Sequence, residues 1–151
     1  MKRVLSIFTV LILLFITSCG TEPNACAMLE EFLAIYSAEG VVYSPSIPEG
    51  EHGSLREDTF EKIYVYRGEM PKNCAIFLSS HIDTASECGV FVCQSDTELI
   101  AITEACRERM RLLAGEGGGI IISSGSIVFY STMSEPSVVE ACWRRVLSSM
   151  A

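Results

Sequence analysis

A short run of apolar residues in the middle of the chain constrains the fold most strongly. The segment Cys88-Gly89-Val90-Phe91-Val92-Cys93 is apolar at both alternating sets of positions, whereas a strand with one exposed face alternates apolar and polar side chains. A strand with this pattern is typical of the middle of a sheet, where both faces are buried. We therefore predict a central strand within residues 87–94.

The second half of the chain continues with clear helix and hairpin signals. Ser95 and Glu98 have the spacing of a capping box, which starts a helix. Apolar residues then recur at steps of three and four until about Ala114, as on the buried face of a helix. A hairpin is predicted over residues 120–130, because Gly125 can take the positive φ of a tight turn. A last helix begins near Ser134, with Pro136 in its first turn.

The order of these elements from residue 87 is β-α-β-β-α, which predicts an α+β domain. A helical connection would leave the first two strands parallel, and the hairpin would make the third antiparallel. We therefore expect a small mixed sheet with helices covering one face.

The first half is less clear. Residues 25–38 predict a helix with Asn24 as N-cap and Gly40 after its end, and the glycines and prolines of residues 41–56 predict a loop. From residue 58 to 82 propensity does not separate short helices from strands.

The charge of the chain excludes some partners. The chain has 19 acidic and 11 basic residues, which gives a formal net charge of −8. Nucleic-acid binding depends on Lys and Arg side chains that neutralise phosphates, so we do not expect a nucleic-acid partner. Adhesion to anionic lipids through a basic patch is disfavoured for the same reason.

The first twenty residues predict where the protein resides. Lys2 and Arg3 precede an apolar run from Val4 to Ile16, which is shorter than the roughly 20 residues of a membrane span and suits the core of a secretory signal. The run ends in Ile-Thr-Ser-Cys, which resembles the lipobox of bacterial lipoproteins. This resemblance implies that residues 1–18 are a signal peptide and that Cys19 carries the lipid, with its palmitate-like acyl chains. A plain secretory signal and a retained membrane span are the alternatives.

The lipobox resemblance also divides the chain. Residues 19–24 would be a lipidated tether, and residues 25–151 would be one α+β domain on the extracytoplasmic face of the cell membrane. Two or more acyl chains anchor a protein stably, whereas one binds only marginally. The membrane is therefore the expected partner, through the lipid anchor.

The remaining cysteines predict a disulfide framework. Six is an even number, and disulfides persist outside the cell, but the sequence does not choose among the pairings. Buried free thiols are the alternative, since cysteine is common in cores. No pair has the C-x₂₋₄-C spacing of a zinc site. The six are Cys26, Cys74, Cys88, Cys93, Cys106 and Cys142.

The chain also resembles a family of small, uncharacterised lipoproteins from Gram-positive gut bacteria, a family built on a domain of unknown function. The similarity covers roughly residues 85–147. It consists of an apolar strand that begins at Glu87, a charged helix from Glu104 to Leu113, and a glycine-containing hairpin from Ile120 to Tyr130. The resemblance implies a lipoprotein of this fold class and assigns no catalytic residue.

We therefore expect a non-enzymatic binding or interaction module, with an unknown envelope protein or small ligand as partner and no cofactor. The alternative is an envelope enzyme, a hydrolase or thiol-redox protein that uses Cys93 or His81. A thiol nucleophile needs an imidazole within hydrogen-bond reach, and the sequence offers only His52 and His81. Metal ligands could come from the loop around His52 or from His81 and Asp83, but solvated loops explain both segments better.

Overall fold

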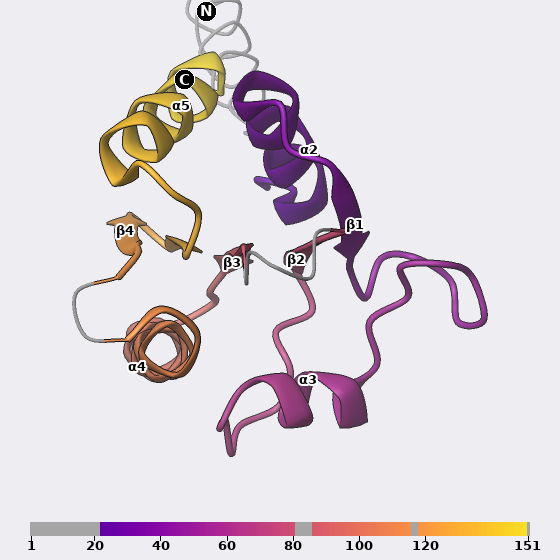
Figure 1. Ribbon diagram of the computed structural model, residues 1–151. Coiled ribbons are helices and arrows are strands. Elements are labelled where there is room, and N and C mark those ends of the chain that lie inside the picture. The colour runs from indigo at the N-terminus through magenta and orange to yellow at the C-terminus, as the bar shows by residue number, and fades with distance from the viewer. Residues whose placement is uncertain (1–21, 81–85, 116–117, 151) are drawn as a thin grey trace, which may run out of the picture.

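The computed structural model describes residues 22–80, 86–115 and 118–150, so Cys19, His81 and Asp83 lie outside the described residues. Within these ranges the chain forms four helices and five strands (Figure 1). In chain order they are α2 (Ala25–Tyr36), β1 (Gly40–Tyr43), α3 (Glu57–Ile63), β2 (Cys74–Ser79), β3 (Glu87–Val92), α4 (Asp96–Ala114), β4 (Ile120–Ser124), β5 (Ile127–Ser131) and α5 (Pro136–Ser149).

The strands form a single five-stranded sheet in the order β1-β2-β3-β5-β4. Strand β3 is central, and all six of its residues are buried. Its neighbours fix the register, with Gly89 opposite Ile76 on one side and opposite Tyr130 on the other. The prediction of a central buried strand is confirmed, and so is the α+β class.

The expected mixed sheet is corrected, because every strand pair in the sheet is antiparallel. Helix α4 does return the chain so that β3 and β4 run in the same direction, but β5 lies between them. Strand β5 is almost entirely buried, whereas β4 ends in the exposed Ser123 and Ser124. The more apolar strand of the hairpin therefore takes the inner position, and the polar strand forms the edge.

The helices cover both faces of the sheet rather than the one face that we expected. Helices α2 and α5 pack on one face, and α3 and α4 lie on the other (Figure 1). The physical reason is the apolar pattern of β3. Val90 belongs to the core under α2 and α5, whereas Phe91 belongs to the core under α3 and α4. Both sets of side chains need a cover that excludes water.

The local signals of the second half are confirmed. The hydroxyl oxygen of Ser95 accepts a hydrogen bond from the backbone N–H of Glu98 at 3.2 Å, and the Glu98 carboxylate accepts one from the N–H of Gln94 at 2.6 Å. This is the reciprocal capping box of α4. Gly125 turns the hairpin with a φ of 57°, and Pro136 is the first residue of α5.

Helix α2 also begins where predicted but ends earlier. The Asn24 side chain accepts a hydrogen bond from the N–H of Ala27 at 3.0 Å. The helix ends at Tyr36 because Ser37, with a φ of 63°, takes the left-handed conformation of a C-cap. Gly40 therefore does not terminate the helix and instead starts β1, a strand that the predicted loop over residues 41–56 did not include.

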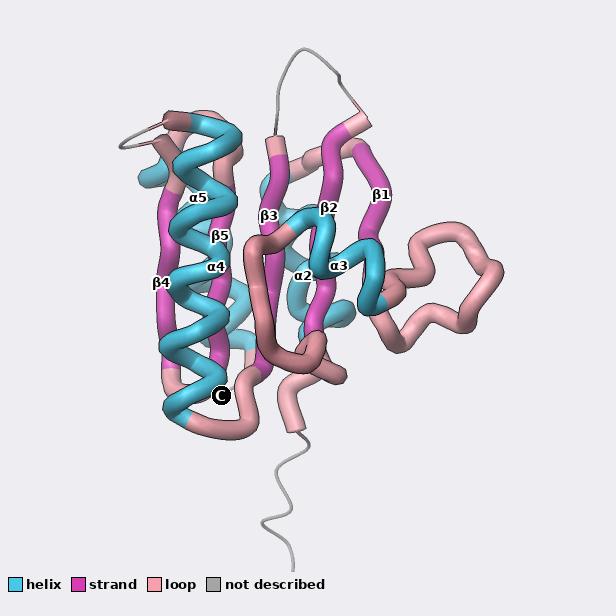
Figure 2. The backbone as a smooth tube through the Cα atoms, turned by 90° about the horizontal axis from the view of Figure 1, so that it is seen from below, coloured by secondary structure: helices cyan, strands magenta, loops and turns pink. Residues whose placement is uncertain are grey.

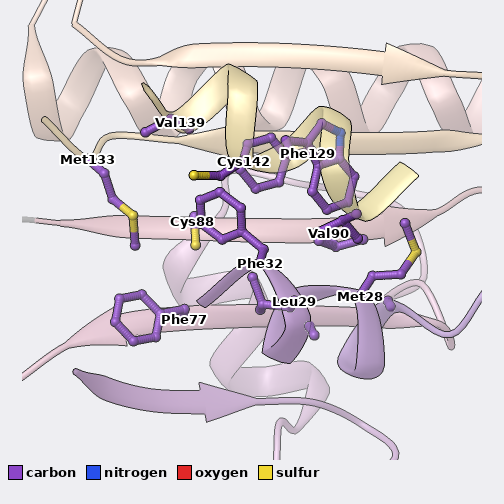
Figure 3. Packing of buried hydrophobic residues seen from close by; sticks show 14 of the residues in the cluster. Met28, Leu29, Phe32, Phe77, Cys88, Val90, Phe129, Met133, Val139 and Cys142 are labelled. Atoms are coloured by element: carbon purple, nitrogen blue, oxygen red, sulfur yellow. The ribbon is translucent and has the colours of Figure 1, made fainter. Parts of the chain in front are cut away.

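Stacked aromatic rings fill the core between the sheet and helices α2 and α5 (Figure 3). The rings of Phe129 and Trp143 stack with their centroids 4.3 Å apart, and Phe32 meets Phe129 at 4.9 Å. The indole Nε1 of Trp143 is buried and has no hydrogen-bond partner among the described residues. Trp143 is therefore a packing residue.

Gly89 leaves room for two aromatic rings in the core under α3 and α4. A Cβ atom at this position would lie 2.6 Å from Cε1 of Tyr130 and 3.1 Å from Cε2 of Phe91. The missing side chain thus leaves room for the Tyr130 ring beside the central strand.

We predict that Gly89→Ala lowers the free energy of unfolding by about 1–3 kcal/mol, because the buried rings must shift to admit one methyl group. Urea unfolding followed by tryptophan fluorescence measures the change. Ser124→Ala, at the exposed end of β4, is the control and should leave the midpoint unchanged. An unchanged midpoint for Gly89→Ala would show that this core is loosely packed.

Candidate functional site

The structure pairs none of the six described cysteines in a disulfide and gives each as a free thiol. The sheet separates most of them: Cys88 and Cys142 belong to one core, and Cys74, Cys93 and Cys106 belong to the other. A disulfide requires Cβ atoms about 4 Å apart, and these side chains instead fill the cores as small apolar groups. The alternative from the sequence, buried thiols, describes five of the six, because Cys26 is half-buried.

Burial also makes these thiols weak nucleophiles. Burial and the Glu98 carboxylate raise the pKa of Cys74 to about 12 and that of Cys93 to about 11. Burial raises the pKa of Cys88 and of Cys106 well above the ordinary value. The thiolate is the reactive form, so the structure gives no support to an enzyme that uses Cys93.

The two histidines do not complete a site with these thiols in the described part of the chain. His52 lies in an exposed loop, where its ring contacts the edge of Tyr43 at a centroid distance of 6.5 Å. His81 lies outside the described residues. Within residues 22–80, 86–115 and 118–150, no group of three His, Cys, Asp or Glu side chains could hold a metal ion.

A buried carboxylate, which sequence reasoning missed, organises the core beneath α4. Glu87 is 3 % exposed and accepts two hydrogen bonds from Arg109, from Nε at 3.0 Å and from Nη2 at 2.7 Å. The hydroxyl of Tyr130 donates to the same carboxylate, and the hydroxyls of Tyr130 and Tyr64 are hydrogen-bonded to each other. One network thus joins β3, β5, α4 and the residue that follows α3.

The charges in this network are balanced. The hydrogen bonds from Arg109 to Glu87 raise the pKa of the arginine, which therefore stays protonated beside the carboxylate. Burial is the main reason why the pKa of Tyr64 and that of Tyr130 lie well above the usual range, so both phenols stay neutral donors. A paired, hydrogen-bonded arrangement is the one in which a buried charge is tolerated.

The sequence carried a signal for this network. Arg109 lies three residues after Cys106 and seven after Ile102, so it shares the apolar stripe of α4 with two buried residues. A charged residue on a buried stripe requires a partner, and Glu87 at the start of an otherwise apolar strand is that partner. The carboxylate and both phenols are buried and paired within the network, so we assign the network to the support of the fold.

A groove of about 1030 Å³ lies on the described surface. It lies between α4 and residues 65–69, the extended segment that follows α3, and we call it the α4 groove. Figure 2 shows this loop running beside α4 on one side of the sheet. Ala101 and Ala105 are among its lining residues, and Tyr66 lines the opposite wall.

The α4 groove is acidic. Four carboxylates and one guanidinium line it: these belong to Glu69, Glu98, Glu104, Glu108 and Arg67. Glu104 and Glu108 also form exposed ion pairs with Arg107 and Arg111, one turn along the helix. Burial and the neighbouring Glu98 raise the pKa of Tyr66, so its hydroxyl remains neutral.

A second, smaller pocket of about 450 Å³ lies at the C-terminal end of α2. Tyr36, Phe77 and Met133 line it together with several serine side chains. Its rim includes Ser79 and Ser86, which flank residues 81–85, and these five residues lie outside the described part of the chain.

We predict that Arg109→Met lowers the free energy of unfolding by about 3 kcal/mol, because it leaves the buried Glu87 carboxylate without its cation. Adding Glu87→Gln should restore much of the loss, since the amide removes the unpaired charge. Urea unfolding of the two single variants and the double variant measures the coupling. Strictly additive effects would contradict the pairing.

We further predict that the six cysteines are unpaired thiols and that the buried ones are shielded in the folded protein. Iodoacetamide at pH 8 should modify Cys74, Cys88 and Cys106 only after unfolding in urea, because they are buried and protonated. Modification in urea should need no reductant. Peptide mass mapping identifies the modified positions. Positions that stay unmodified in urea until a reductant is added would reveal disulfides.

Comparison with known proteins found no relative of this chain. No protein-family model matches the chain, and no curated protein or solved structure matches it significantly.

Proposed function

We propose that the protein is a binding module that a lipid on Cys19 holds on the extracytoplasmic face of a cell membrane. The support for the anchor comes from the sequence: the charged start, the short apolar run and the Ile-Thr-Ser-Cys ending. The likeness to small lipoproteins from Gram-positive gut bacteria belongs to the same proposal. In the described part of the chain, no helix has the length and apolarity of a membrane span.

One structural observation carries the proposal further, namely how the chain enters the domain. Asn73, just before β2, donates from Nδ2 to the carbonyl oxygen of Pro23 at 2.7 Å and accepts at Oδ1 from the N–H of Ala25 at 2.9 Å. One side chain thus fastens the chain on both sides of the Asn24 cap. The folded domain begins within four residues of Cys19.

This attachment limits the distance between lipid and domain. Four residues reach at most about 14 Å when fully extended, so an acylated Cys19 would hold the start of α2 close to the bilayer surface. The first turn of α4 lies at the same end of the sheet, since it follows the end of β3 that pairs beside Asn73. The β4–β5 turn also lies there (Figure 2).

The binding role rests on the α4 groove. Its walls come from α4 and from the segment after α3. The groove begins at the anchored end, where Ser95 and Glu98 line it, and extends along α4 to Glu108, on the face of the sheet opposite α2 and α5. The acidic surface would also keep the domain from adhering to anionic head groups.

We predict that Cys19→Ala moves the protein out of the membrane fraction or leaves an unprocessed precursor. The wild-type chain should remain with membranes in high salt and leave them only in detergent, because acyl chains and not charges hold it. Fractionation followed by immunoblotting measures both. Cys26→Ala is the matched control and should behave as wild type. A mature, membrane-bound Cys19→Ala variant would contradict the anchor.

A further inference from the structure

We infer that the α4 groove binds an extended segment of a partner protein that carries Lys or Arg side chains. The inference deepens the proposed binding function and rests on it. Three features of the groove support this occupant: its open shape, its charge and the free backbone along one wall.

The shape favours an extended chain over an enclosed small molecule. Pockets for small ligands bury most of the ligand surface, whereas this groove of about 1030 Å³ is open to solvent. Ala101 and Ala105 are one helical turn apart, and their small side chains leave space above this part of α4. A chain laid along α4 would fill that space.

The charge favours a basic occupant. Glu69 and Glu98 make no ion pair with a Lys or Arg among the described residues, whereas Glu104 and Glu108 pair only with exposed arginines on the same helix. Exposed pairs of this kind contribute little, so a cation from outside can replace them. With Arg67 counted, the lining keeps a net charge of −3.

The backbone of the second wall is free to pair. Arg67, Gly68 and Glu69 form no helix or strand, and their N–H and C=O groups enter no backbone–backbone hydrogen bond in the described residues. An extended segment with free backbone groups can hydrogen-bond to a peptide laid alongside it. A free cation would pair with the carboxylates, but the backbone N–H and C=O groups of residues 67–69 would then remain hydrogen-bonded to water.

Tyr66 adds a surface for a long cationic side chain. Its ring lines the groove next to Glu98, and its edge-on contact with Phe60, at a centroid distance of 5.9 Å, supports it from behind. An ammonium or guanidinium group over an aromatic face gains further attraction. The carboxylate and the ring together select Lys and Arg over neutral side chains.

The test uses the full chain in detergent micelles and fluorescein-labelled ten-residue peptides that alternate Lys with Ser. Fluorescence polarisation should give a dissociation constant on the order of 10 μM at low salt, with the matched Glu–Ser peptide at least a hundredfold weaker. Because log K falls with salt for charge-driven contacts, binding should weaken between 50 and 300 mM NaCl.

Matched variants assign the binding to the groove. Glu69→Gln with Glu104→Gln should weaken the lysine peptide about tenfold, since two exposed charge contacts are lost. Glu30→Gln with Glu31→Gln makes the same change in net charge on α2, on the other face of the sheet, and should alter binding less than twofold. Equal weakening by both pairs would overturn the inference.

Two further outcomes separate a peptide from a simple cation. Methylation of alternate backbone nitrogens in the lysine peptide should weaken binding at least fivefold if the peptide pairs with residues 67–69. If methylation has no effect and spermidine competes as well per charge, the groove is a diffuse cation site and the inference is wrong. These results do not depend on Cys19, so they are distinguishable from a failure of the lipid anchor.

Discussion

The buried Glu87 carboxylate connects the two parts of the molecule that form the α4 groove. Through Arg109 it holds α4, which is one wall, and through Tyr130 it reaches Tyr64, which directly precedes the other wall. A buried, paired charge of this kind contributes little net stability compared with apolar packing. Its geometry is nevertheless specific, since a bidentate guanidinium accepts one orientation of the carboxylate. The network therefore sets the spacing between α4 and the segment after α3.

Much of the second half of the fold could be predicted because its signals are local. The Ser95–Glu98 capping box, the turn at Gly125 and Pro136 at the start of α5 each depend on a few neighbouring residues. The strand order could not be read the same way, because β5 inserts between β3 and β4 through non-local pairing. The apolar pattern of β3 did indicate that helices cover both faces of the sheet. A strand with Val90 facing one way and Phe91 the other requires helices on both faces.

The candidate site was harder to predict. Tyr66 and Ala101 are 35 positions apart, and only the packing of α3 and α4 on the same face of the sheet brings them to one groove. The even number of cysteines indicated disulfides, whereas the structure places five of them as buried thiols in two cores on opposite faces of the sheet. A count of cysteines does not reveal this burial. Arg109 shows the opposite case, because its position on a buried stripe of α4 was a usable signal for a partner such as Glu87.

We propose a membrane anchor at one end of the domain and a groove along α4 that binds a basic segment. Asn73 fastens the entering chain, so that lipid and domain would be separated by only a few residues. Mass spectrometry of the mature protein, isolated from membranes of cells that express the full chain, tests the central claim most directly. The account predicts an N-terminal peptide that begins at Cys19 and carries diacylglycerol. An unmodified Cys19, or residues 1–18 still attached, would contradict it.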